Sequence, residues 1–513
     1  MVISNDIHIF WIDLFSGAGG TTSGIHLAGR GKDIKTKVVA CVNHDAKAIL
    51  SHLANHPDCI HFTEDIRDFE VVKKLKKLVI QLRSQYPNCL INIWASLECT
   101  NFSKAKGGLP RDGDSRTLAE HMKMYVAELA PDYLWIENVM EFMSWGPLDE
   151  NGKPISRNRG RDYIKWVDMI KSFGYNFDWK QLNSANFGAY TSRSRYFAQF
   201  PKEGLPISWP VKTHTKNPSS EKNLFDIQLE KWKAVKDVLN LDSEGNSIFN
   251  RKKPLVDNTL KRIYAGLVKF VANGDESFIL KYNSVNKNGK HVPPGIEEPC
   301  PTVAAQSRLG LINANFLQSY YGNGQSHSEN EPCPTVSTKD RFGKVNYLMM
   351  NYSKSQSRPI DYPAATIVNN DKHNLVSVEG NKHHYLMNPQ FKCEGHSVYN
   401  PSPTIIARQD KKPLGLITCD RASGYHIPVY DDDSEIMIQI KQFMAYFGIV
   451  DIKMRMLEVI ELLRIQGFPE GYKLVGNQTD QKKFIGNSVE VRTASSIVMA
   501  NYNGIIEHFK VAA

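Results

Sequence analysis

Short apolar runs alternate with longer amphipathic segments over the first 200 residues. Apolar runs of this length are typical of strands buried on both faces of a parallel sheet, and amphipathic segments between them are typical of crossover helices. Strands are predicted at residues 7–15, 37–42, 60–62, 90–94, 133–136 and 196–200. Helices are predicted at residues 71–82, 118–129 and 164–170. This order predicts an α/β fold for the first part of the chain.

The pattern changes after about residue 210. Residues 212–222 are polar and rich in His, Pro and Ser, which predicts a linker, and residues 231–239 and 260–271 have a helical pattern. From about residue 278 the element Pro-x-(Pro/Ala)-Thr-(Val/Ile) occurs four times, at 299–303, 332–336, 363–367 and 401–405. Repeats at such a period are stacked supersecondary units, and their Pro and β-branched residues favour short strands and turns. We therefore expect a β-rich insertion here.

The last segment returns to α/β character. Residues 457–463 have an amphipathic helical pattern, and residues 493–500 predict a C-terminal helix. We expect four parts along the chain. They are residues 1–212 as the first part of a catalytic domain, 213–277 as a connecting segment, 278–440 as a repeat-containing domain, and 441–513 as a return to the catalytic domain.

Composition narrows the class of protein. The chain has 513 residues, so two domains are expected, and its net charge of +9 favours a polyanionic partner. The eight cysteines form no Cys-x-x-Cys pair, so we expect no zinc site and no metal ligand, and a reducing cytoplasm fits their spacing. The N-terminus lacks the order of a signal peptide, and no apolar run approaches membrane-spanning length, so we expect no membrane association.

Cys99 follows the predicted strand at 90–94 and precedes a basic, glycine-containing loop at 104–108. Reacting groups of α/β enzymes lie beyond the carboxyl ends of strands, so Cys99 is a candidate nucleophile. An inert buried cysteine is the alternative, because Cys commonly behaves as a small hydrophobic residue.

A glycine-rich turn, 16–20, joins the first predicted strand to a helical pattern. Such a turn lets a ligand approach the backbone at a helix N-terminus, although a tight strand–helix turn without ligand explains it equally well. Asn43, His44 and Asp45 end the second predicted strand, where dinucleotide folds place a ribose-binding acid.

Two further strands deliver polar side chains. Glu137 follows the strand at 133–136, where it is a candidate general acid or substrate clamp; a capping or surface carboxylate is the alternative. Arg195 directly precedes the strand at 196–200, and a surface arginine is its alternative interpretation.

Together these pieces resemble the cytosine-C5 DNA methyltransferase family. The matching motifs, in the family's order, are residues 13–20 (the S-adenosylmethionine loop), 137–139 (Glu-Asn-Val), 191–195 (the arginine motif), 464–469 and 486–489. Three motifs depart from the family pattern. Leu97-Glu98-Cys99-Thr100 replaces Pro-Pro-Cys-Gln, Asn43 replaces the ribose-binding Glu, and Thr191 replaces the Gln of the arginine motif.

The resemblance implies a Rossmann-like S-adenosylmethionine methyltransferase sheet with helices on both faces, plus an inserted β-rich target-recognition domain. It implies methyl transfer to C5 of a flipped cytosine through a covalent Cys99 adduct, assisted by Glu137, Arg193 and Arg195. The implied cofactor residues are Phe15, Ser16, Gly17, Ala18, Gly19, Gly20, Asn43, His44, Asp65, Ile66, Asn487, Ser488 and Val489. The implied DNA-contacting residues are Ser103, Lys104 and Lys106.

The implied partner is double-stranded DNA, bound by a monomer at the nucleoid of a prokaryotic or phage-type cytoplasm. A companion restriction enzyme fits this family, and the sequence does not decide whether one exists. Polar loops at 283–291, 321–327, 353–358 and 390–396 are candidates for reading DNA sequence, with a purely structural β-module as the alternative. Two rival functions stay open: an RNA cytosine methyltransferase, and an inactive DNA-binding homologue suggested by Glu98 and Thr100.

Overall fold

The structure, a computed structural model, describes part of the chain continuously and the insertion mainly through its strands. The described residues are 7–30, 34–97, 118–147, 149–150, 154–156, 159–218, 228–240, 243, 246–249, 251–268, 277–281, 300–301, 309–313, 317–318, 326–327, 347–350, 358–359, 373–376, 383–387, 396–397, 415–421, 429–447 and 449–511. None of the helices in these ranges is long and apolar enough to cross a membrane.

A seven-stranded sheet forms the half of the molecule that the sequence predicts to be catalytic, here named the catalytic half. Its strand order is β3-β2-β1-β4-β5-β8-β6. Its strands are β1 (Ile9–Leu14), β2 (Thr36–Val42), β3 (Ile60–Phe62), β4 (Leu90–Ser96), β5 (Tyr133–Asn138), β6 (Asp178–Asn183) and β8 (Ser194–Pro201). The first five run parallel, whereas β8 is antiparallel to both of its neighbours. The chain leaves β1 toward β2 on one side and later returns to β4 on the other. Ligands of open α/β sheets bind at such a reversal of strand order.

Both faces of this sheet are covered, as the uninterrupted apolar strands require. On one face Phe10, Ile12 and Leu14 pack against α3 (Phe69–Gln85), α5 (Met122–Leu129) and α6 (Arg161–Lys171). On the other face the alternate residues, including Trp11, Trp94 and Trp135, pack against α1 (Gly20–Gly29) and α11 (Val491–Val511). The predicted α/β fold with helices on both faces is confirmed.

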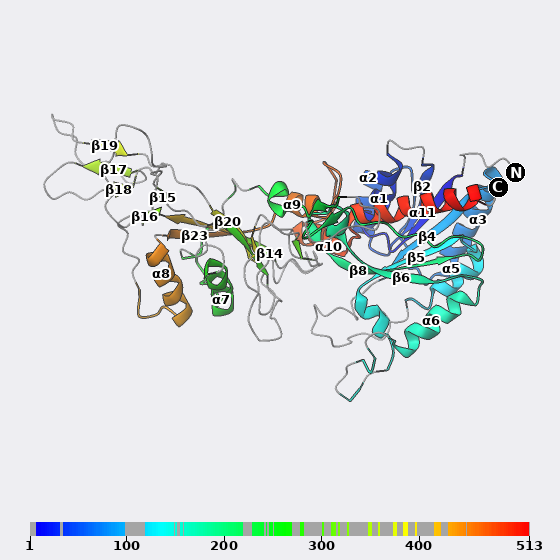
Figure 1. The fold of residues 1–513 in the computed structure, drawn as a ribbon, viewed down its shortest axis with the longest axis horizontal. Helices are drawn as coiled ribbons and strands as arrows, with labels where there is room; N and C mark the ends of the chain where they lie inside the picture. Colours follow the sequence, from blue (N-terminus) through cyan, green and yellow to red (C-terminus); the bar gives the residue numbers. More distant parts are fainter. Residues whose placement is uncertain are drawn as a thin grey trace.

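The C-terminal segment completes the catalytic half. Helix α11 packs along α1, although the two lie at opposite ends of the sequence (Figure 1). Before it come α9 (Val459–Ile465) and α10 (Gln478–Asn487), and the helix after β2 is α2 (Ala46–Asn55). The predicted C-terminal helix is therefore confirmed and extends to Val511.

A second seven-stranded sheet lies in the inserted region, at the other end of the molecule in Figure 1. Its pairings are mainly antiparallel, which confirms the expected β-rich insertion. Its strands are β11 (Asn246–Ser247), β12 (Ser277–Lys281), β14 (Leu309–Asn313), β20 (His383–Met387), β21 (His396–Ser397), β22 (Gly415–Arg421) and β23 (Ile449–Met456). Helices α7 (Asp257–Gly266) and α8 (Glu435–Phe447) pack against each other beside this sheet.

Shorter strands complete the insertion and its connection. A three-stranded sheet joins β17 (Tyr347–Met350), β18 (Arg358–Pro359) and β19 (His373–Val376), and β15 (Leu317–Gln318) pairs with β16 (Ser326–His327). The helix predicted at 231–239 is wrong. That segment holds β10 (Glu230–Lys231), paired with β9 (His214–Thr215), and a single 3₁₀ turn, Val235–Val238. Strand pairing and burial of Val235 together override the local helical pattern.

The first Pro-Thr element reaches the catalytic half. Its Cys300 and Pro301 form β13 (Cys300–Pro301), which pairs with β7 (Thr191–Ser192) of the arginine motif. The other three elements lie outside the described residues, as do most of the four candidate recognition loops. The equivalence of the four elements therefore stays a prediction.

Candidate functional site

The turn after β1 has the backbone that its glycines predict. Phe15, Gly17 and Gly19 have positive φ values of 58°, 53° and 100°. The Ser16 N–H donates to the Val42 carbonyl at 3.2 Å, which ties the turn to β2. A left-handed conformation is uncommon for a side chain such as that of Phe15, and such outliers persist where surrounding structure enforces them, often at ligand sites.

The C-terminal motif closes against this turn. A Cβ atom on Gly20 would lie 2.5 Å from the Val489 carbonyl oxygen and 2.9 Å from the Ser488 Cβ atom. A Cβ atom on Gly24 would lie 2.5 Å from that of Ala494. Only glycine therefore lets α1 approach this segment so closely. The structure brings Ser488 and Val489 to the glycine turn, as the resemblance implies.

The two polar residues Asn43 and Asp45, which follow β2, make different contacts. Asp45 caps α2 by accepting from the backbone N–H groups of Lys47 and Ala48. Its carboxylate also lies 3.2 Å from the Lys483 ammonium group. Asn43 is bonded to Asp45 through its side-chain oxygen, which accepts from the Asp45 N–H at 2.9 Å. Because Asp45 has these structural roles, Asn43 is the better candidate for a ribose hydroxyl.

The residues after β3 lie near those after β2. Asp65 accepts three hydrogen bonds from the Arg67 side chain, and these bonds are the main cause that lowers the pKa of Asp65. His44 is exposed and its charge also lowers that pKa, so the two side chains are near each other. Ile66 is buried, and its carbonyl accepts from the Tyr125 hydroxyl at 2.9 Å.

Glu137 and the two arginines of the arginine motif converge in the buried interior. The Glu137 Oε1 atom lies 3.4 Å from Arg195 Nε and 3.8 Å from Arg193 Nη2. Glu137 is the second-to-last residue of β5 and is 5% exposed, while Arg193 is 3% exposed. Arg193 also donates to the Gly486 carbonyl at 3.2 Å, which links this cluster to the C-terminal motif. Neither a surface carboxylate nor a surface arginine fits these positions.

Burial controls the protonation of this cluster. Burial raises the pKa of Glu137 above its usual value, and the Arg193 and Arg195 charges lower it in part. A carboxyl group with a raised pKa keeps its proton at higher pH, which is what a proton donor needs. The cluster can thus offer one acidic proton and two fixed positive charges at the same place.

Cys99 lies outside the described residues, together with Ser103, Lys104 and Lys106. The chain is described to Leu97, two positions before the cysteine, and the Leu97 carbonyl accepts from the Asn138 side chain at 3.5 Å. Asn138 is the residue after Glu137. The described part of this segment therefore ends at Leu97, beside the end of β5 and next to the charged cluster.

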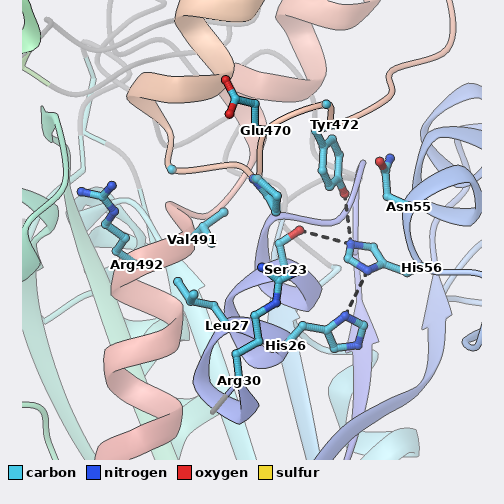
Figure 2. A pocket seen from close by; sticks show the side chains of 13 residues that line it. Ser23, His26, Leu27, Arg30, Asn55, His56, Glu470, Tyr472, Val491 and Arg492 are labelled. Atoms are coloured by element: carbon cyan, nitrogen blue, oxygen red, sulfur yellow. Dashed lines mark hydrogen bonds between the residues drawn. The ribbon is translucent and has the colours of Figure 1, made fainter. Parts of the chain in front are cut away.

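The cavity shown in Figure 2 lies between α1, α2 and the C-terminal segment and has a volume of about 300 Å³. Its lining residues come from α1, α2 and the C-terminal segment: Ser23, His26, Leu27, Arg30, Asn55, His56, Gly467, Pro469, Glu470, Gly471, Tyr472, Val491 and Arg492. None of the residues implied for catalysis or cofactor binding lines it. It is therefore distinct from the carboxyl edge of the sheet.

Tyr472 is a supporting residue that the sequence did not reveal. Its hydroxyl donates to the Ala18 carbonyl at 2.5 Å, and its oxygen would lie 2.5 Å from a Cβ atom on Gly19. The same hydroxyl lies 3.2 Å from His56 Nε2. Tyr472 and Ala18 are 454 residues apart, so no local sequence pattern could predict this contact.

Comparison with known proteins decides the family. A model of the family described as C-5 cytosine-specific DNA methylase matches residues 9–502. The chain belongs to this family. The family resemblance is thereby confirmed, and with it the class of methyltransferase to which the chain is assigned.

Individual relatives match to different extents. The type II methyltransferase M.AquIA of Picosynechococcus is 26% identical over 231 residues, which cover 44% of this chain and 86% of that protein. M.BanI of Aneurinibacillus aneurinilyticus is 22% identical over 520 residues, with 98% and 99% covered. M.XorII of Xanthomonas oryzae is 27% identical over 206 residues, with 39% and 43% covered. Among solved structures, the S. pombe Dnmt2 methyltransferase is 13% identical with a TM-score of 0.44, covering 96% of this chain and 97% of that one.

Proposed function

We propose that this protein methylates C5 of cytosine in duplex DNA, with S-adenosylmethionine as methyl donor and Cys99 as covalent nucleophile. The observation that carries the proposal is the buried contact of Glu137 with Arg193 and Arg195 at the carboxyl edge of the sheet. Beside it lie the strand that leads toward Cys99 and the glycine turn closed by the C-terminal motif. Family membership supplies the reaction class.

The glycine turn has the features that a polar cofactor requires. A Cβ atom on Gly17 would meet no atom of the described residues within 4 Å, so this position faces open space. The Ser16 hydroxyl is buried and has no hydrogen-bond partner among those residues, so a ligand could satisfy it. We propose that the cofactor lies along Phe15–Gly20 between Asn43 and Val489, with Asp65 and Ile66 toward its adenine. S-adenosylmethionine supplies an electrophilic methyl group when bound.

The charged cluster would prepare the base. Cytosine C5 is a weak nucleophile, and the base must leave the duplex before a side chain can reach C6. Attack by the Cys99 thiolate forms an S–C6 bond and moves electron density toward N3 and O2. Glu137 donates its proton to N3, and Arg195 with Arg193 stabilises the charge at O2. C5 would then take the methyl group that the bound cofactor supplies, leaving S-adenosylhomocysteine. Loss of the C5 proton to water would expel the Cys99 thiolate, and N3 would return its proton to Glu137.

The β-rich insertion is our proposed reader of the DNA sequence. Glu137 and Arg195 would identify cytosine but no neighbouring base, so flanking bases need contacts elsewhere. Each good base-edge contact supplies about 1–3 kcal/mol of discrimination. The pairing of β13 with β7 attaches the insertion directly beside Arg193. We expect Ala substitutions in the four candidate loops to change the methylated sequence. An unchanged methylated sequence after all four sets of substitutions would contradict this role.

The direct test is nucleoside mass analysis of DNA and RNA from a host that lacks other cytosine methyltransferases. We expect 5-methylcytosine in the DNA and none above background in the RNA, and methylation-sensitive sequencing should reveal one duplex motif. Methylcytosine confined to RNA would support the RNA rival. Its absence from both, with DNA binding retained, would support an inactive homologue.

Cys99→Ser tests the nucleophile, with Cys89→Ser as the matched control because Cys89 is a buried cysteine away from the site. We expect Cys99→Ser to lose methyl transfer and keep most DNA binding, and Cys89→Ser to keep both. A 5-fluorocytosine substrate should trap a covalent adduct with Cys99, because fluorine cannot leave as a proton does. Appreciable turnover by Cys99→Ser would overturn the assignment.

The cellular setting remains part of this proposal. The relatives M.AquIA and M.BanI are named as type II methyltransferases. We propose that the protein acts as a monomer on DNA at the nucleoid and protects its sites from a companion restriction enzyme. A nuclease from the same strain that recognises the same DNA motif, and cuts it only when the motif is unmethylated, would support that pairing.

A further inference from the structure

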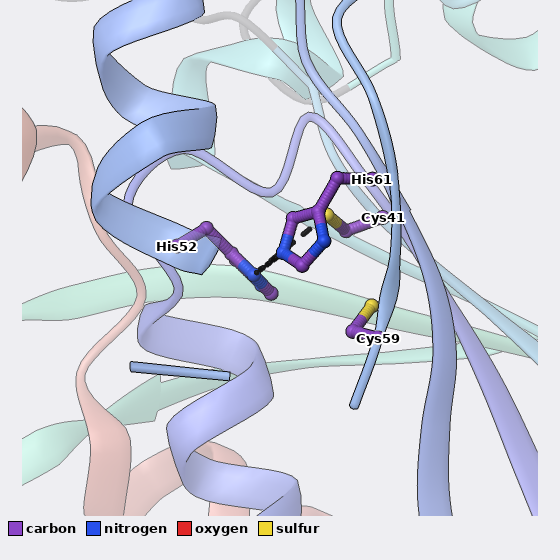
Figure 3. Close-up of side chains that lie close together, drawn as sticks. All are labelled: Cys41, His52, Cys59 and His61. Atoms are coloured by element: carbon purple, nitrogen blue, oxygen red, sulfur yellow. Dashed lines mark hydrogen bonds between the residues drawn. The ribbon is translucent and has the colours of Figure 1, made fainter. Parts of the chain in front are cut away.

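Two cysteines and two histidines meet between β2, β3 and α2. They are Cys41 in β2, His52 in α2, Cys59 before β3 and His61 in β3 (Figure 3). One possible ligand atom from each residue lies within 4.8 Å of all the others. Cys41 and His52 are 0% exposed, Cys59 is 7% exposed and His61 is half-buried, so most of the group is enclosed by protein. The proposed methyl transfer uses none of these four side chains.

The pairing of the strands explains the convergence. β2 and β3 pair in parallel with Cys41 opposite His61. Cys59 precedes His61 by two positions, and residues two apart on an extended chain point to the same face. Helix α2 connects the two strands and presents His52 over them. Three separate backbone segments therefore fix the four side chains.

The spacing of the donor atoms suits one small cation. A tetrahedral zinc site with Zn–N near 2.0 Å and Zn–S near 2.3 Å separates its ligand atoms by roughly 3.3–3.8 Å. Here Cys41 Sγ lies 3.7 Å from His52 Nδ1, and that atom lies 2.9 Å from His61 Nε2. The other donor pairs lie within 4.8 Å of one another, so movements of up to about 1 Å would close the cage around one ion.

A hydrogen-bond chain orients His52 for such a role. The Thr22 hydroxyl donates to Asp13 Oδ2 at 2.9 Å, so its oxygen is left to accept from His52 Nε2, also at 2.9 Å. A neutral imidazole that carries its proton on Nε2 has a lone pair on Nδ1, the atom that faces Cys41 and His61. Metal-binding histidines commonly donate their second ring N–H to such a partner.

We propose that Cys41, His52, Cys59 and His61 bind one tetrahedral Zn²⁺ ion. A set of two sulfur and two nitrogen donors is typical of zinc. Binding would release the two thiol protons to solvent and form two Zn–S and two Zn–N bonds. Zn²⁺ with two thiolates and two neutral imidazoles has no net charge, which suits a mostly buried site.

All four positions of this tetrahedron are protein side chains, so the site is structural. It would join β2, β3 and α2 to one another, and through Thr22 to the helix that begins at the glycine turn. This inference departs from the expectation of no metal, which rested on the absence of a Cys-x-x-Cys pair. It is independent of the proposed methyl transfer, because metal content is measured without activity.

The first experiment measures metal in the full-length protein purified under reducing conditions without chelator. We expect about one zinc ion per chain by mass spectrometry of the metal, and X-ray absorption with about two sulfur and two nitrogen neighbours. After zinc removal, Co²⁺ should give the intense d–d and thiolate charge-transfer absorption of a tetrahedral site. A chain that holds no zinc and takes up no Co²⁺ would overturn the proposal.

Variants assign the site to these residues. Cys59→Ser with His61→Asn should reduce zinc to below about one-fifth of the wild-type content, because two of four ligands are lost. Cys89→Ser and His26→Gln, which change one thiol and one imidazole outside the set, should keep the full content. Wild-type zinc content in the double variant would overturn the assignment.

Two alternatives have distinct results. A Cys41–Cys59 disulfide in protein isolated under reducing conditions, detected by peptide mass analysis, would exclude the zinc site. A metal-free hydrogen-bonded group would show no zinc and no Co²⁺ spectrum. If the double variant does not fold, the sulfur and nitrogen count from X-ray absorption of the wild-type protein decides instead. A shell without sulfur would reject the proposal.

Discussion

Two enclosed groups of polar side chains lie around the same sheet, and they differ in charge and in origin. The charged cluster consists of Glu137, Arg193 and Arg195, at β5 and β8. The soft-donor cluster consists of Cys41, His52, Cys59 and His61, at β2 and β3. The first is suited to changing the charge of a substrate, and the second to holding a cation in place. One α/β sheet can therefore support chemistry at β5 and β8 and stability at β2 and β3.

The two clusters also differ in how many of their buried polar atoms have hydrogen-bond partners. Glu137 Oε1 is buried without a hydrogen-bond partner among the described residues and depends on two nearby guanidinium groups. His52 uses both ring nitrogens, one toward Thr22 and one toward His61. An under-satisfied buried group is typical of a site that awaits a substrate. Substitutions should therefore affect activity in the charged cluster and stability in the soft-donor cluster.

The largest expected effect is on turnover. Glu137→Gln preserves the shape of the side chain but removes the acidic proton, so we expect the methylation rate to fall by about 10²–10⁴-fold. Single-turnover kinetics with a DNA duplex containing the target motif would measure it. DNA binding and thermal unfolding should change little, and a rate within a few-fold of wild type would remove Glu137 from the mechanism.

The pH dependence of the rate should distinguish Glu137 from other acids. Burial raises the pKa of Glu137, so the active protonated form persists above the pH at which an ordinary carboxyl loses its proton. Above that pKa the rate should fall about tenfold per pH unit, and Glu137→Gln should lack this limb. The raised pKa also makes protonation stabilise the fold. That contribution is complete below the unfolded-state pKa and is lost as pH rises through the folded-state pKa.

Removal of the proposed zinc ion should lower the thermal stability of the protein. We expect chelation to lower the melting temperature by about 5 °C or more, because the binding free energy of a structural zinc ion adds to that of folding. Differential scanning calorimetry with and without chelator would measure the shift. The Cys59→Ser, His61→Asn variant is the control, since its melting temperature should not respond to chelator. Equal shifts in both proteins would mean that the chelator acts elsewhere.

A smaller effect should mark the closure of the glycine turn. Gly20→Ala would place a methyl group 2.5 Å from the Val489 carbonyl oxygen, so we expect a loss of about 1–3 kcal/mol in the free energy of unfolding. Gly29→Ala, in the same helix, places its methyl group 3.4 Å from Thr36 Cγ2 and should be within about 0.5 kcal/mol of wild type. Denaturant unfolding would compare them, and equal stabilities would show that the C-terminal segment can move away.

The smallest effect on the methylation rate is expected from substitutions at Glu98 and Thr100, the residues on either side of the proposed nucleophile. Glu98→Pro with Thr100→Gln restores the family pattern around Cys99, so we expect the methylation rate to be unchanged or modestly higher. Steady-state rates of the variant and the wild type would test this. A collapse in rate without unfolding would give Glu98 a role of its own in this protein.

The sequence by itself determined the strands of the first sheet and the order of its motifs. The apolar runs that became β1, β2, β4 and β5 are buried on both faces, so continuous hydrophobicity is their signature. Glu137, Arg193 and Arg195 were also identified from motifs, and the structure brings them together. Edge strand β6 escaped detection because its exposed, polar residues carry no such pattern.

Only the tertiary structure decided which distant residues share a site. Tyr472 supports the glycine turn across 454 residues, and Val489 closes it from the far end of the chain. The soft-donor cluster has sequence spacings of 11, 7 and 2 residues (52−41, 59−52 and 61−59), which match no metal-binding motif. Its convergence depends on the register of β2 and β3 and on the position of α2. Local patterns encode burial and turns, whereas such contacts arise only when separate segments pack together.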